Sequence, residues 1–125
     1  MKDETINKLI SIQENIKNSN IENRTPPQII CVSKTFALSK LLPLIDFGQT
    51  HFGENKVQEA EQKWSVLKKN NKNIKLHMVG RLQTNKAKKA VQIFDFIHSV
   101  DSQKLADTLK KGKKKLIEGF LILSK

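Results

Sequence analysis

The sequence of 125 residues has one cysteine and no long hydrophobic run. A lone cysteine cannot form an internal disulfide, and its place in the apolar run 29–32 predicts a small buried side chain in a reducing compartment. No apolar run reaches the roughly 18 residues that a transmembrane helix needs, and no signal-peptide hydrophobic region follows the charged first residues. We therefore expect a cytoplasmic protein.

Acidic residues are scarce: 12 Asp and Glu oppose 23 Lys and Arg, giving a net charge of +11. A strong basic excess can indicate a nucleic-acid or membrane partner. However, only two of the basic residues are Arg, the side chain best suited to reading bases and phosphates. Lys and Asn share A-rich codons, and Asn is also abundant. We therefore expect a solvated basic surface, with neither nucleic acid nor membrane as partner.

Apolar periodicity predicts a helix followed by four strand–helix units. Strands are expected over residues 28–33, 50–52, 74–79 and 96–100, and helices over 3–20, from 38 to Gly48, and after residues 56, 86 and 101. Asp101 or Ser102 is expected to cap the last helix. Pro43 predicts a short second helix, residues 53–55 a turn, and residues 68–73 a polar loop.

The spacing of these units predicts an α/β fold with parallel strands. Both a doubly wound sheet and a barrel fit the pattern, although 125 residues are too few for a complete (β/α)₈ barrel, which needs roughly 200–250. No glycine-rich dinucleotide or phosphate-loop motif follows any strand.

Polar residues follow every predicted strand, at the edge where parallel α/β folds hold their ligands. Lys34 is the most informative, because it directly follows a largely apolar run. A lysine at the mouth of a buried strand would be partly desolvated, which lowers its pKa and frees the neutral amine to attack an aldehyde. The alternative is a lysine that only extends its charge into solvent at a strand end.

Three histidines, His51, His77 and His98, lie on neighbouring predicted strands. Three converging imidazoles could bind zinc, but strand alternation leaves their directions open, and no Cys partner or H-E-x-x-H motif accompanies them. We expect core or rim histidines and no metal. A serine nucleophile is also poorly supported, because no G-x-S-x-G elbow is present.

Four blocks of sequence together carry a resemblance to a known family. They are Cys-Val-Ser-Lys-Thr at 31–35, His-Phe-Gly-Glu-Asn-Lys-Val-Gln-Glu at 51–59, His-Met-Val-Gly-Arg-Leu-Gln-Thr-Asn-Lys at 77–86, and His-Ser-Val-Asp-Ser at 98–102. In this order and spacing they resemble the pyridoxal phosphate homeostasis proteins, also called the YggS or PROSC family. The resemblance covers about residues 5–112.

The resemblance implies a fold similar to the N-terminal (β/α)₈ barrel domain of alanine racemase. It also implies a protein that binds pyridoxal 5′-phosphate (PLP) without known catalysis, and that buffers the cofactor and delivers it to apo-enzymes. By the same resemblance, the residues expected to bind the cofactor are Lys34, which forms the Schiff base, Asn55 near the ring, and His77, Gly80, Asn85 and Ser99 lining the pocket. The alternative is a PLP-dependent enzyme similar to alanine racemase. Racemisation needs a second acid/base group, often Tyr, and the sequence has no Tyr.

The resemblance also implies that part of the barrel is missing. Family members are about twice as long, this chain ends where a fifth strand is expected, and the family holds the phosphate with later residues. We therefore expect a partial PLP-binding barrel domain over 1–112 and a divergent basic and apolar tail over 113–125. The lysine-rich run at 110–115 indicates a frameshift or split gene, with a divergent but complete half-barrel as the alternative. Such a chain alone should hold PLP weakly and be marginally stable.

Overall fold

A computed structural model describes residues 4–19, 28–98 and 102–111 of the chain. The helices are α1 (Glu4–Ser19), α2 (Leu38–Phe47), α3 (Val57–Asn70), α4 (Ala87–Ile93) and α5 (Gln103–Lys111), with a 3₁₀ turn, η1 (Thr84–Lys86), before α4. The strands are β1 (Cys31–Val32), β2 (His51–Glu54), β3 (Lys75–Met78) and β4 (Phe96–Ile97). Strands and helices alternate after α1, as the sequence predicts.

The four strands form one sheet in the order β1-β2-β3-β4, and every neighbouring pair is parallel. Phe52 pairs with Cys31 on one side and with Leu76 on the other, and Met78 pairs with Ile97. Sequential parallel strands joined by one helix each are the βα units that the spacing indicates. The predicted α/β fold of four such units after a helix is confirmed.

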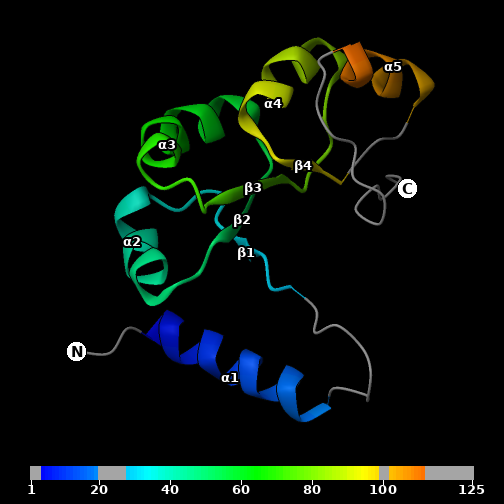
Figure 1. The fold of residues 1–125 in the computed structure, drawn as a ribbon. Helices are drawn as coiled ribbons and strands as arrows, with labels where there is room; N and C mark the ends of the chain where they lie inside the picture. The colour runs from blue at the N-terminus through cyan, green and yellow to red at the C-terminus, as the bar shows by residue number, and fades with distance from the viewer. Residues whose placement is uncertain (1–3, 20–27, 99–101, 112–125) are drawn as a thin grey trace.

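Helices α2, α3 and α4 lie along the same side of the sheet (Figure 1). Because side chains alternate along a strand, Phe52 and Glu54 of β2 face these helices, whereas His51 and Gly53 face the other way. Phe52 packs against Trp64 of α3, with ring centroids 4.8 Å apart. The buried apolar residues that form this layer and its ends are Leu9, Leu41, Leu44, Phe52, Val57, Ala60, Trp64, Ile74, Leu76, Met78, Leu82, Ala87, Ala90, Val91, Phe94, Ile97 and Leu105.

The second helix is longer than Pro43 predicts. It runs for ten residues with Pro43 inside, and the carbonyl that Pro43 leaves without its usual donor belongs to Ser39, an exposed residue that water can reach. Gly48 ends the helix at a φ of 111°, as expected. The N–H of Gly48 donates to the Ile45 carbonyl, and the N–H of Gln49 donates to the Leu44 carbonyl, so these two carbonyls near the helix end are satisfied.

Several boundaries also differ from the sequence-based expectations. Gly53 and Glu54 are part of β2 and do not form a turn, and residues 68–70 continue α3. Strands β1 and β4 are only two residues long. Cys31 is half-buried, and burial raises the pKa of its thiol. Of the two candidate caps of α5, Ser102 accepts a hydrogen bond from the Leu105 N–H at 3.1 Å.

None of the helices in the described part of the chain is long and apolar enough to cross a membrane. The predicted tail over 113–125 lies outside the described residues, and so does Asp101.

Candidate functional site

Of the residues expected to bind a ligand, Lys34, Asn55 and Gly80 follow strands β1, β2 and β3 at the carboxyl edge of the sheet. Val32 pairs with Gly53 and the Ser33 N–H donates to the Gly53 carbonyl, so Lys34 lies in the turn just after β1, and Asn55 lies just after β2. Met78 pairs with Glu54 and with Ile97, which places Val79 and His98 in the same row. Parallel strands thus bring residues separated by some twenty positions in sequence to one edge.

Lys34 itself is exposed. Of the two alternatives for this lysine, partial burial at a strand end is wrong and the solvent-exposed side chain agrees with the structure, because β1 ends at Val32 and the lysine lies in the turn that follows. Even Val32, on the strand face away from the helices, is 49% exposed. The amine of Lys34 is therefore accessible to a ligand at this edge.

Asn55 and Gly80 lie in close contact. A Cβ placed on Gly80 would lie 2.7 Å from the Cβ of Asn55, closer than real side chains approach one another. Glycine at position 80 therefore lets the segment after β3 pass against the end of β2. The structure brings these two predicted site residues together.

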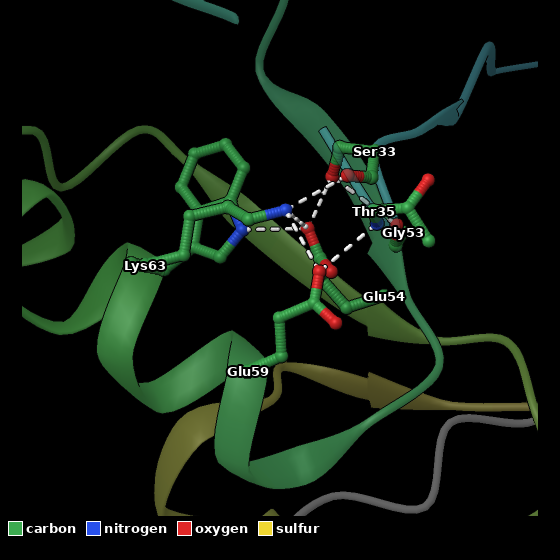
Figure 2. A network of polar contacts seen from close by, with 7 residues as sticks. Ser33, Thr35, Gly53, Glu54, Glu59 and Lys63 are labelled. Carbon is green, nitrogen blue, oxygen red and sulfur yellow. Dashed lines mark hydrogen bonds and ion pairs between the residues drawn. The ribbon is translucent and has the colours of Figure 1, made fainter. Parts of the chain in front are cut away.

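A buried polar cluster lies between β2, the turn at Ser33 and Thr35, and α3, on the helix side of the sheet (Figure 2). Glu54 is fully buried, and its Oε2 accepts hydrogen bonds from Ser33 Oγ at 2.5 Å and from Trp64 Nε1 at 3.0 Å. The same oxygen lies 2.9 Å from Nζ of Lys63, whose side chain is 8% exposed. A buried carboxylate is tolerable only when hydrogen-bond donors and an opposite charge surround it. Glu54 has two neutral donors, Ser33 and Trp64, and one cation, Lys63.

The ammonium of Lys63 also contacts two groups other than the carboxylate of Glu54. Its Nζ donates to the backbone carbonyl of Ser33 at 2.8 Å and forms an ion pair with Glu59 Oε1 at 3.4 Å. Glu59 Oε1 in turn accepts a hydrogen bond from the N–H of Thr35 at 2.9 Å. That hydrogen bond, followed by the charge of Lys63, lowers the pKa of Glu59. We call Ser33, Glu54, Glu59, Lys63 and Trp64 the anchor cluster.

Thr35 has a φ of 67°, the sole positive value among the described residues other than glycine. A β-branched residue in the left-handed region is strained by roughly 1–3 kcal/mol, and such a conformation persists only where the surroundings impose it. The hydrogen bond to Glu59 is one interaction that holds it.

Sequence reasoning missed the anchor cluster. The sequence pattern predicts a turn at Glu54, and it does not distinguish Lys63 and Glu59 from other charged residues of a helix. One signal was available: if residues 51–54 form a strand, Glu54 shares the helix-facing side with Phe52 and needs a cationic partner from the following helix.

The second carboxylate oxygen of Glu54, Oε1, has no hydrogen-bond partner in the part of the chain that the structure describes.

The three histidines form a chain across the opposite face of the sheet. His51 Nδ1 lies 2.8 Å from His77 Nε2, and His77 Nδ1 lies 2.8 Å from His98 Nε2. His77 is fully buried and stacks on Phe96, with ring centroids 4.4 Å apart. A neutral imidazole has one donor and one acceptor nitrogen, so the middle ring fixes one direction of donation along the chain.

Burial keeps these imidazoles neutral. It lowers the pKa of His77 to about 4, with His98 and His51 acting in the same direction and Asp95 against it. Burial also lowers the pKa values of His51, where Lys75 adds to the effect, and of His98. No group of three or more His, Cys, Asp or Glu among the described residues could hold a metal ion.

A groove of about 1040 Å³ lies beside this edge. Asn55 lines it from the end of β2, and Thr84 and Lys86 line it from η1. Asn85, between these two, is exposed, but neither it nor Lys34 is among the lining residues. Ser99, the remaining predicted site residue, lies outside the described part of the chain.

Comparison with known proteins supports the resemblance seen in the sequence. The chain is 34% identical over 108 residues to the pyridoxal phosphate homeostasis protein of Pasteurella multocida, covering 84% of this chain and 46% of that protein. It is 41% identical over 95 residues to the protein of the same name from Buchnera aphidicola of Acyrthosiphon pisum, covering 76% and 47%. No family model matches the chain.

A solved structure agrees. PipY of Synechococcus elongatus, determined with PLP bound, superposes with a TM-score of 0.69 at 38% identity, covering 85% of this chain and 46% of PipY. The chain thus spans about half the length of the relatives that it matches. The resemblance to the pyridoxal phosphate homeostasis proteins is confirmed, and so is the α/β fold class expected for part of a (β/α)₈ barrel.

Proposed function

We propose that this chain, a relative of the pyridoxal phosphate homeostasis proteins, binds PLP through the side-chain amine of Lys34. One observation carries the proposal: an accessible lysine lies in the turn after β1, at the carboxyl edge of a parallel sheet. PipY, the related structure, has PLP bound.

The described residues fit such a cofactor. Its aldehyde requires a primary amine that a ligand can reach, and Lys34 is exposed at the edge. Gly80 packs closely against Asn55, and because glycine has no side chain, nothing at position 80 obstructs that edge. When bound, the cofactor supplies an electrophilic carbon and an electron-withdrawing ring.

The proposed roles of the other residues follow from their positions. Asn55 offers an amide to the ring from the end of β2, and Gly80 allows the close approach of the neighbouring segment. His77, which the resemblance assigns to the pocket lining, has a fully buried side chain, so we propose that it supports the edge from within the sheet. Asn85 and Ser99 are assigned to the pocket on the family resemblance alone.

We further propose that the protein stores PLP and passes it to apo-enzymes without catalysing a reaction of its own. The relatives are named homeostasis proteins. The chain has no Tyr to serve as the second acid/base group of a racemase, and the histidines of the opposite face are hydrogen-bonded to one another.

The test is covalent capture of PLP on the full chain. Wild-type protein is mixed with PLP and reduced with borohydride, and the modified lysine is located by peptide mass spectrometry. We expect the label at Lys34, and loss of the visible absorbance of bound cofactor in Lys34→Ala. Lys40, an exposed lysine of α2, provides the matched control, and Lys40→Ala should bind as wild type does. Equal labelling of Lys34 and Lys40 in the wild type would show that Lys34 is only a surface amine.

A further inference from the structure

The backbone on both sides of Lys34 is fixed, although its side chain is exposed. Ser33, on one side, is 1% exposed and donates its backbone N–H to the Gly53 carbonyl at 2.8 Å. Thr35, on the other side, holds the strained positive φ. An exposed side chain has no packing to direct it, so the direction of the Lys34 amine depends on these two flanking residues.

Both flanking residues are held by one helix, α3. Lys63 reaches the carbonyl of Ser33, and Glu59, one turn earlier on α3, reaches the N–H of Thr35 (Figure 2). The ion pair between Lys63 and Glu59 joins the two contacts. Lys63 is in turn fixed by the buried carboxylate of Glu54. The turn that carries Lys34 is thus fastened at two points to a helix that begins more than twenty residues later.

We propose that Glu59 and Lys63 are positioning residues for Lys34. By holding Ser33 and Thr35, they select the turn conformation in which the Lys34 amine projects over the carboxyl edge. This inference rests on the proposed PLP binding at Lys34. It adds that the reactivity of the lysine is set by an acid and a base on α3 that act through the backbone of the turn.

Glu59 is the residue to substitute first. Its side chain is 32% exposed, so its removal does not leave a buried charge unpaired, whereas removal of Lys63 would strand Glu54. Glu59→Ala removes the acceptor for the Thr35 N–H, and Glu59→Gln keeps an oxygen there. Glu61→Ala is the matched control, because Glu61 lies on the same helix but pairs with Lys89.

The measurement is the initial rate of PLP capture at Lys34, relative to that at Lys40 in the same sample, together with the thermal melting midpoint. Displacement of a reacting group by an ångström can cost on the order of a hundredfold in rate, so we expect Glu59→Ala to lower this ratio by roughly tenfold or more. Glu59→Gln and Glu61→Ala should stay near wild type, and the melting midpoints should change little.

A second variant tests the cause. Glycine adopts a positive φ without strain, so in a Thr35→Gly background the turn no longer needs Glu59 to hold it. The Glu59→Ala substitution should therefore cost much less in Thr35→Gly than in wild type. A general loss of structure would lower the Lys34-to-Lys40 ratio equally in both backgrounds, and that result would overturn the positioning role.

The remaining outcomes separate the two proposals. If wild type captures PLP at Lys34 and Glu59→Ala does so at the same relative rate, the positioning inference is wrong and PLP binding stands. If wild type shows no preference for Lys34 over Lys40, the proposed function itself fails. Equal losses in Glu59→Gln and Glu59→Ala would show that the hydrogen bond to Thr35 is not the cause.

Discussion

Two buried polar groups lie on opposite faces of the same short sheet, and they are stabilised in opposite ways. The anchor cluster, on the helix side, surrounds the buried carboxylate of Glu54 with an ammonium and two neutral donors. The histidine chain, His51–His77–His98, has no charge to compensate, because burial lowers the pKa values of all three rings. One face stabilises a charge and the other avoids one.

This difference predicts different sensitivities. A compensated charge becomes costly when its partner is removed, at any pH where the charge exists. A chain of neutral imidazoles becomes costly when protons are added, because a cationic ring cannot accept a hydrogen bond and is poorly solvated. The anchor cluster should thus respond most to substitution and the histidine chain to acid.

The largest effect is expected for Lys63→Met. It leaves Glu54 buried without its cation, which should lower the free energy of unfolding by about 3–5 kcal/mol in urea titrations at neutral pH. The double variant Lys63→Met/Glu54→Gln removes both charges and should recover much of the loss. A double variant as unstable as Lys63→Met would show that packing of the lysine stem, and not the charge, matters at this position.

A somewhat smaller effect is expected on acidification. The pKa of His77 is lowered from 6.5 to about 4, so between these values the unfolded chain binds a proton that the folded chain does not. Stability should be insensitive to this group above about pH 6.5 and should fall as the pH drops toward 4, by up to about 3 kcal/mol.

The control for this acid effect is His77→Gln, which cannot titrate in that range. Urea titrations from pH 7 to pH 4 should show a shallower loss in the variant than in wild type. The charged groups that shift the pKa values of the histidine chain are present in both proteins: Lys75 acts on His51, and Asp95 acts on His51 and His77. Identical pH profiles would mean that the histidine chain is not what responds to acid.

The smallest effect is expected for Trp64→Phe. It removes one of the donors to Glu54 Oε2 but leaves Ser33 and Lys63 in place, and a hydrogen bond to a charged group contributes roughly 1.5–3 kcal/mol. We expect a loss of about 2 kcal/mol at neutral pH, smaller than that of Lys63→Met. A loss larger than that of Lys63→Met would show that the hydrogen bond from Trp64 stabilises Glu54 more than the ion pair with Lys63 does.

Much of the architecture was predictable because it depends on local pattern. Apolar spacing predicted all four strands and the helices between them, and Gly48 and Ser102 were expected at helix ends, where the structure has them. Prediction failed at Pro43, where an exposed carbonyl tolerates the missing donor, and at residues 53–54, where pairing with β1 and β3 overrides the turn tendency of glycine.

The candidate site was predictable in part. Family resemblance pointed to Lys34, Asn55 and Gly80, and the structure places all three at the carboxyl edge. The assigned roles of His77, Asn85 and Ser99 remain predictions. The sequence leaves both a partly buried and an exposed Lys34 open, because the length of β1 depends on where pairing with β2 stops.

Local sequence patterns specify the order of elements, the parallel α/β class and the chemistry at the strand ends, because these follow from periodicities of two and 3.6 residues and from the types of residue present. Which polar residues meet depends on the packing of the whole fold. Glu59 and Lys63 reach the turn of Lys34, and three histidines join across three strands, because strand register and helix packing bring together residues distant in sequence. Those distances are set by the sheet as a whole, and no local pattern contains them.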